Sequence, residues 1–148
     1  PNNVSMPFLG RITPSLGAIP LPDDKEATRN FVNCIDYRVK ENKAIAIYPE
    51  AHIWPYYTHI RPFKNTSFRY PIKYNSPVFC FTNTYQKRKF SKNPKIVTYI
   101  DGPFFPNGDI PTSEAKDILR NQVYDKMVER SLNNNVELIK YIKETKHD

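Results

Sequence analysis

The fold depends most on the stretch Ala44-Ile45-Ala46-Ile47-Tyr48-Pro49-Glu50-Ala51-His52, in which an apolar run ends in a Pro-Glu dipeptide. An apolar run without polar alternation is typical of a strand buried on both faces of a parallel sheet. We therefore predict a buried strand over 44–48 that delivers Glu50 to a loop tip. Such a carboxylate needs partners, so Glu50 either ties the loop to backbone donors or an arginine, or belongs to a site.

Upstream of this strand the sequence predicts a helix. From Glu26 to about Glu41, apolar residues recur at three- and four-residue spacing, and Asp23 or Asp24 can cap the first turn. Residues 15–22 predict a short strand before that helix. A strand, a helix and a buried strand in this order favour an α/β fold with a mixed, mostly parallel sheet and crossover helices.

Downstream of the strand, residues 49–64 carry three prolines and no period, which predicts a long loop. In open α/β sheets, ligands bind at this end of the strands. Thr66 can cap a helix through Tyr74, which Pro71 is expected to kink or shorten. The aromatic residues of the loop are expected to pack it against the sheet or to face a pocket.

Two β-rich runs, 78–84 and 95–100, flank a basic turn at Gln86–Lys89 and predict an antiparallel pair at the sheet edge. The final segment, 112–148, is predicted to be helical, starting at Thr112 or Ser113. Its predicted buried stripe consists of Ala115, Ile118, Leu119, Val123 and Met127. Three asparagines at 133–135 interrupt the pattern, and residues 136–143 are expected to resume as a shorter helix or a tail.

Composition restricts the class of protein and of partner. The 148 residues fit one domain, which we take to be partial, and 14 Pro against 4 Gly predict many extended connectors. A net charge of +7 favours anionic partners. Cys34 and Cys80 have neither metal-ligand nor disulfide spacing, and are expected to be buried free thiols in a reducing cytosol. No apolar stretch approaches the ~18 residues of a membrane-spanning helix, and no signal peptide is apparent.

Together with the residues downstream of it, the Pro-Glu stretch resembles the third motif of the glycerophospholipid acyltransferase family, Phe-Pro-Glu-Gly-Thr-Arg-Ser. Tyr48, Pro49 and Glu50 match its first three positions. Four other stretches resemble further features of the family and occur in the family's order and spacing: Gly17–Ile19, Phe63-Lys64, Phe68–Lys73 and Ser76-Pro77-Val78. The resemblance extends from about Phe8 to Asp101.

This sequence departs from the family pattern at several places. Ala51, His52 and Ile53 replace the Gly, Thr and Arg of the third motif, and Pro22-Asp23 stands where a second Arg is common. Cys80 replaces the second Pro of the fourth motif. The loss of both arginines puts glycerol-3-phosphate and lysophosphatidate in doubt as acceptors.

The family's catalytic pair is a His followed by an Asp five positions later, and no histidine of this sequence has such a partner. In the family this motif precedes the second one, so we expect it upstream of Pro1, together with the first strand and helix. The chain as given is therefore expected to be inactive. The sheet edge left open by the missing strand would favour a homodimer.

The resemblance implies acyl transfer from acyl-CoA or acyl-carrier protein to a glycerolipid hydroxyl, with no bound cofactor and no metal. The predicted substrate-binding residues are Glu50, His52, Arg61 and Lys64, of which Glu50 and Lys64 would hold the polar head of the acceptor, and Arg61 and Lys64 could contact an anion. Arg11 could supply a further anion contact. The enzyme would work in the cytoplasm, peripheral to the inner face of the membrane.

Two alternatives concern other residues. His52 and His59 could be a metal pair or replacement bases, although their spacing fits no familiar metal site. If Trp54, Tyr56 and Tyr57 faced solvent, they would instead suggest an anchor at the membrane interface.

The basic turn around Lys87–Phe90 raises a rival function, a nucleic-acid-binding or anionic-membrane-binding α/β module without catalysis. We expect no nucleic acid partner, because the turn is short and the aromatic residues gather at the Glu50 loop. An anionic membrane surface suits the turn and a membrane-bound product, while a solvated hairpin tip is the simplest interpretation.

Overall fold

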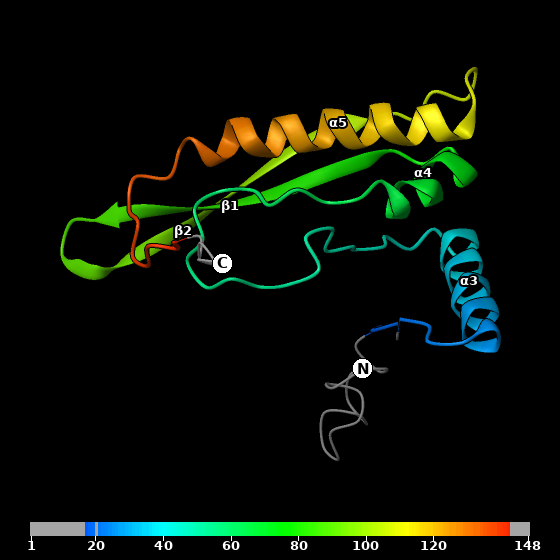
Figure 1. The fold of residues 1–148 in the computed structure, drawn as a ribbon, viewed down its shortest axis with the longest axis horizontal. Coiled ribbons are helices and arrows are strands. Elements are labelled where there is room, and N and C mark those ends of the chain that lie inside the picture. The colour runs from blue at the N-terminus through cyan, green and yellow to red at the C-terminus, as the bar shows by residue number, and fades with distance from the viewer. Residues whose placement is uncertain (1–16, 20, 143–148) are drawn as a thin grey trace, which may run out of the picture. The chain divides into compact units, whose positions relative to one another are not determined.

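The computed structural model describes residues 17–19 and 21–142 (Figure 1). The chain consists of two compact units, Pro1–Ala46 and Ile47–Asp148. Within the described residues there are three α-helices and one antiparallel sheet of two strands. The prediction of a mostly parallel sheet with crossover helices is therefore wrong, and the chain has a small α/β fold.

The first unit contains α3 (Lys25–Lys40), which confirms the predicted helix. Its N-cap is Asp24, whose Oδ1 accepts from the Ala27 N–H at 2.7 Å, while the Thr28 hydroxyl donates to the Asp24 carbonyl oxygen. The first of these bonds satisfies a backbone N–H that a helix start leaves open. Ile35 is buried. The strand expected over 15–22 is not seen at 17–19, 21 or 22, and its other residues lie outside the described part, as does Arg11.

The buried strand expected over 44–48 is not formed. These residues have no regular secondary structure, and Ile47 and Tyr48 are 44% and 85% exposed. A strand persists only where neighbouring strands bind its backbone groups. The two strands that the structure describes pair with each other, so the apolar run at 44–48 has no sheet to join.

The second unit is built on a hairpin of β1 (Val78–Arg88) and β2 (Ser91–Phe104), which confirms the predicted antiparallel pair. Thr84 lies opposite Val97 in the register, and the strands are joined by the turn at Lys89 and Phe90. The outer edge of β1 is partly covered at Tyr85 and Lys87. There Asn134 and Asn135 bind its backbone through side-chain and main-chain groups.

A short helical segment precedes the hairpin in this unit. The single-turn 3₁₀ helix η1 (Thr66–Phe68) leads into α4 (Arg69–Tyr74), which confirms the short helix predicted here. Pro71 lies in the first turn of α4, where its missing N–H removes no intrahelical bond. Asn75 ends the helix in the left-handed conformation at φ 45°.

The long helix α5 (Thr112–Ser131) lies along one face of the hairpin (Figure 1). Four members of the predicted stripe are buried, at four-residue spacing: Ala115, Leu119, Val123 and Met127. Ile118 is 40% exposed, so its assignment to the stripe was wrong. No helix resumes over 136–142, and residue 143 lies outside the described part.

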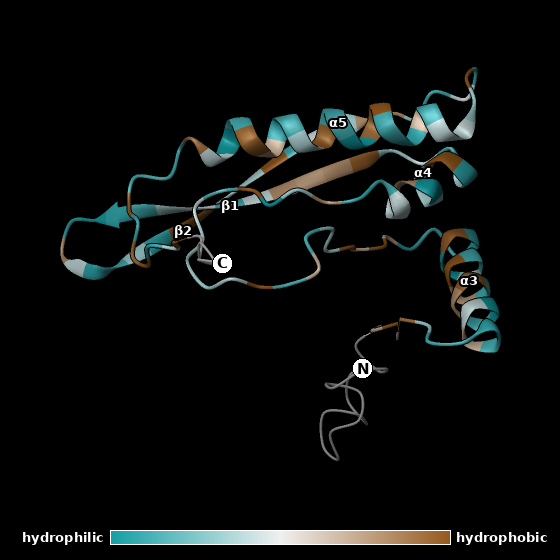
Figure 2. Ribbon diagram, in the orientation of Figure 1, coloured by the Kyte–Doolittle hydropathy of each residue, from teal (hydrophilic) through white to brown (hydrophobic). Residues whose placement is uncertain are grey.

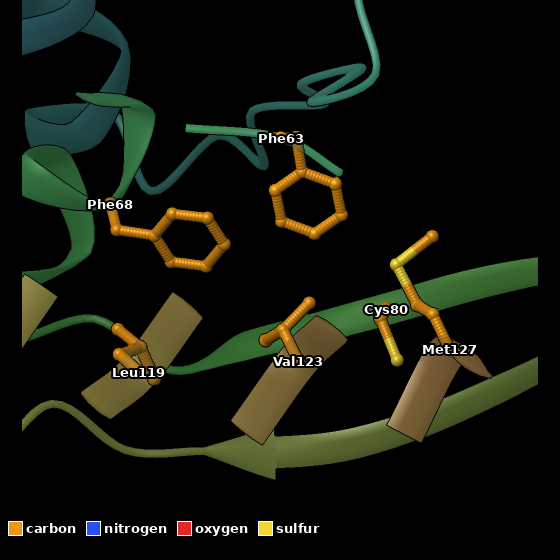
Figure 3. Close-up of a cluster of buried hydrophobic side chains, with 6 residues drawn as sticks. All are labelled: Phe63, Phe68, Cys80, Leu119, Val123 and Met127. Carbon is orange, nitrogen blue, oxygen red and sulfur yellow. The ribbon is translucent and has the colours of Figure 1, made fainter. Parts of the chain in front are cut away.

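The core of the second unit is closed by side chains from the loop and from η1. Figure 3 shows Phe63 and Phe68 above the buried stripe of α5 and Cys80 of β1. The rings of Phe63 and Phe68 lie 6.2 Å apart and nearly parallel. The loop is thus fastened at its C-terminal end by apolar burial.

The two faces of the hairpin differ. On β1, Cys80, Thr82 and Thr84 are buried, whereas Phe81 between them is 61% exposed. Ile100, opposite Phe81 on β2, is 62% exposed. Because successive side chains in a strand point to opposite faces, these apolar residues lie on the face away from α5. Figure 2 shows apolar colour on parts of both strands, whereas the end of the hairpin is mostly hydrophilic.

Candidate functional site

The loop between Pro49 and Asn65 carries the candidate site, and it contains no helix or strand, as predicted. It begins with a tight turn in which the Ala51 N–H donates to the Tyr48 carbonyl oxygen at 3.1 Å and the His52 N–H to the Glu50 carbonyl oxygen at 2.8 Å. Ala51 has φ 64°, in the left-handed region that favours glycine. Pro49 blocks a regular strand beyond Tyr48.

Glu50 and Arg61 close this loop. The Arg61 backbone N–H donates to Glu50 Oε2 at 2.9 Å, and Arg61 Nη2 donates to the Glu50 carbonyl oxygen at 2.8 Å. Nη2 also donates to the His52 carbonyl oxygen, and Nε lies 3.5 Å from Glu50 Oε2. The Arg61 guanidinium covers the ring of Trp54 at 4.8 Å. The arginine therefore acts here as a tie for the loop, and its charge is balanced by Glu50.

The structure places the other predicted site residues at the surface. The side chain of His52 is exposed, and its backbone carbonyl makes the contact with Arg61. Lys64 is also exposed, next to buried Phe63, and no contact among the described residues joins it to the Glu50–Arg61 pair. The structure thus brings Glu50, Arg61 and the main chain of His52 together, and leaves Lys64 apart from them.

A cluster of aromatic rings packs on the same loop. Trp54 and Tyr141 stack with ring centroids 5.1 Å apart, and Tyr57 meets both rings edge-on. The Tyr141 hydroxyl donates to the Pro55 carbonyl oxygen at 2.8 Å. His59 packs against Tyr57, with 5.7 Å between centroids. The rings therefore hold the loop against the segment that comes after α5.

The segment after α5 is a part of the site that the sequence did not reveal. Asn134 donates to the Thr58 carbonyl oxygen at 2.8 Å and accepts from the Tyr85 N–H at 2.7 Å, so it links the loop to β1. The asparagine run at 133–135 was the available signal, because an amide can bind a carbonyl and an N–H at once. Sequence spacing gives no indication of such a distant partner.

Nucleophilic and metal chemistry have little support in the described residues. Both cysteines are free, and burial, with the charge of Asp101 second, raises the pKa of the Cys80 thiol. A buried thiol of this kind is a poor nucleophile. No three His, Cys, Asp or Glu side chains in the described ranges are grouped so that they could hold a metal ion.

Comparison with known proteins yielded no family model, no curated protein and no solved structure that matches this chain. No helix within residues 17–19 and 21–142 is long and apolar enough to cross a membrane.

Proposed function

We propose that this chain is the acceptor-binding portion of an acyltransferase of the glycerophospholipid type. The observation that carries the proposal is the turn at 48–52. Ala51 has φ 64°, the left-handed conformation that glycine adopts without strain, at the position where the family motif has its glycine. The main chain thus has a geometry that suits the motif, although the side chain differs.

Glu50 is the residue that we assign to the acceptor. Its Oε2 is occupied by Arg61, whereas Oε1 makes no hydrogen bond to any described residue. A carboxylate oxygen held in this way can accept from an acceptor hydroxyl and fix its position. Lys64, with no ion pair among the described residues, suits an anionic group of the acceptor better than Arg61, whose charge Glu50 balances.

The reaction is attack of the acceptor hydroxyl oxygen on the thioester carbonyl carbon. The C–O bond forms, the C–S bond breaks, and the hydroxyl proton leaves with the thiol of coenzyme A or acyl-carrier protein. A general base must take that proton, and we assign the role to a histidine oriented by an aspartate five positions later, a pair that residues 1–148 do not contain. The residues of this chain position the acceptor.

The exposed apolar face of the hairpin supports the same proposal. Phe81 and Ile100 lie opposite each other in the register and are about equally exposed, on the face away from α5. Exposed apolar side chains of this kind suit an interaction with an apolar partner, such as the acyl chain of a lipid. The acceptor and product are lipids, so we place the reaction at the inner face of the cytoplasmic membrane.

The test is thiol release from acyl-CoA by the complete encoded protein, with lysophospholipids as acceptors. We expect Glu50→Gln to lower kcat/KM by at least about tenfold through the acceptor KM, because it weakens the acceptor's hydrogen bond. Glu137→Gln, at an exposed position after α5, is the matched control. Equal activity of both variants would remove Glu50 from the site, and no thiol release by the wild type would refute acyl transfer.

A further inference from the structure

Positive charge is unevenly distributed along this chain. Residues 51–100 contain nine Lys and Arg and no Asp or Glu. In α5, by contrast, four basic residues are balanced by four acidic ones. The net charge of +7 is therefore concentrated in the loop and the hairpin.

Five of the nine basic residues lie at the far end of the hairpin, and all five are exposed: Lys87, Arg88, Lys89, Lys92 and Lys95. We call residues 87–95 the hairpin tip, which extends beyond the end of α5 (Figure 1). The acidic residues Glu50, Asp101 and Glu129 form ion pairs with Arg61, Arg130 and Lys126, and none of these pairs includes a side chain of the tip. Its charges are thus available to an external partner.

One large apolar side chain stands among these cations. Phe90 is 92% exposed at the turn, and Lys89 Nζ lies 5.4 Å from the centre of its ring. An exposed ring beside a cationic side chain suits an interface that is apolar inside and anionic at its surface.

We infer that the hairpin tip binds the surface of an anionic lipid bilayer, with Phe90 entering the headgroup region and the cations meeting lipid phosphates. DNA fits the tip less well, because a two-residue turn carries a single ring for stacking and no group placed to read base edges. The inference rests on the proposed function and deepens it, because it names the element that would hold the enzyme at its lipid substrate. Vesicle binding can nevertheless be measured without an assay of acyl transfer.

The experiment is co-sedimentation of the complete protein with vesicles of phosphatidylserine and phosphatidylcholine, and with vesicles of phosphatidylcholine alone. We expect salt-sensitive binding to the anionic vesicles only. The triple variant Lys87→Gln, Arg88→Gln and Lys89→Gln should weaken that binding roughly 100-fold, since each basic residue near an anionic surface contributes about fivefold. The control removes the same number of charges from exposed positions elsewhere, with Lys25→Gln, Lys43→Gln and Lys140→Gln.

A second pair of variants tests the ring. Phe90→Ala should weaken vesicle binding several-fold with little change in its salt dependence, whereas Phe105→Ala, 65% exposed just beyond the other end of β2, should not. In the wild type, vesicles should slow amide hydrogen exchange over 86–95, a measurement that needs no variant.

Three results would overturn the inference: no binding to anionic vesicles, equal weakening by both triple variants, or tighter binding to a DNA duplex than to vesicles. Vesicle binding without thiol release would leave the inference standing and refute the proposed function. Thiol release without vesicle binding would support the proposed function and refute the inference about the hairpin tip.

Discussion

Arg61 holds Glu50 by both its main chain and its side chain. The Arg61 N–H donates to Glu50 Oε2 at 2.9 Å, and Arg61 Nη2 donates to the Glu50 carbonyl oxygen at 2.8 Å. These two bonds join residues eleven positions apart in a loop without regular secondary structure. The position of the carboxylate that we assign to the acceptor therefore depends on one arginine.

Removing that arginine side chain should loosen the loop. We expect Arg61→Met to lower the free energy of unfolding by about 2 kcal/mol, because two carbonyl oxygens lose a charged donor. Urea denaturation measures the change, and hydrogen exchange over 50–61 should accelerate. Lys64→Met, at an exposed position three residues away, should change neither quantity. Equal stability of the two variants would show that Arg61 does not hold the loop.

The turn before the loop predicts a stabilising substitution. Ala51 has φ 64°, where a Cβ atom is strained, so Ala51→Gly should raise the free energy of unfolding by about 1 kcal/mol. Ala44→Gly, also exposed but without the left-handed conformation, should lower it slightly by increasing the entropy of the unfolded chain. Thermal denaturation distinguishes the two. Destabilisation by Ala51→Gly would argue against the motif-like turn.

Gly102 is required by the pairing of β2 with the start of β1. It has φ 132°, and a Cβ added to it would lie 2.7 Å from the carbonyl oxygen of Val78 on the paired strand. Gly102→Ala should therefore lower the free energy of unfolding by about 2 kcal/mol or more. Gly108→Ala is the control, because nothing lies within 4 Å of its added Cβ. Similar stability of the two variants would contradict the described pairing.

The ion pair between β2 and α5 predicts a dependence on pH. Arg130 donates to both carboxylate oxygens of Asp101, at distances of 2.5–3.1 Å, and this hydrogen bonding lowers the pKa of Asp101. Because the pKa of Asp101 is lower in the folded state than in the unfolded chain, the ion pair contributes its full stabilisation at pH values above the ordinary aspartate pKa. This stabilisation is lost as the pH falls from the ordinary pKa through the lowered pKa of the folded state.

Asp101→Asn should therefore be less stable than the wild type at neutral pH, and the difference should shrink in acid. Denaturation at several pH values measures it. Asp125→Asn, an exposed change on α5, removes the same charge without the pair. A constant difference between Asp101→Asn and the wild type across this pH range would show that the pair does not titrate with folding.

The sequence predicted those elements whose determinants are local. The Asp24 cap lies three residues from the N–H it binds, and the α5 stripe repeats every four residues, so short-range pattern sufficed. The hairpin was equally visible, because two β-rich runs flank a short basic turn. Ile118 was misassigned because it lies beside the buried stripe of α5, and the sequence does not show how much of the helix surface the rest of the unit covers.

The failures concern distant partners. The apolar run at 44–48 has the composition of a buried strand, but pairing depends on other strands, and the described residues supply none for it. The contacts of Tyr141 with Pro55 and of Asn134 with Thr58 span 86 and 76 positions. No periodicity in the sequence reports such contacts, so the cover of the candidate loop became visible only in three dimensions.

Acyl transfer is tested most directly by thiol release from acyl-CoA, with and without lysophospholipid, by the complete encoded protein and by residues 1–148 alone. We expect acceptor-dependent release and a His with an Asp five positions later in the complete protein, and no release by the 148-residue chain, in which no histidine has such a partner. Absence of that pair together with absence of release would refute the acyltransferase, and would leave a basic α/β binding module.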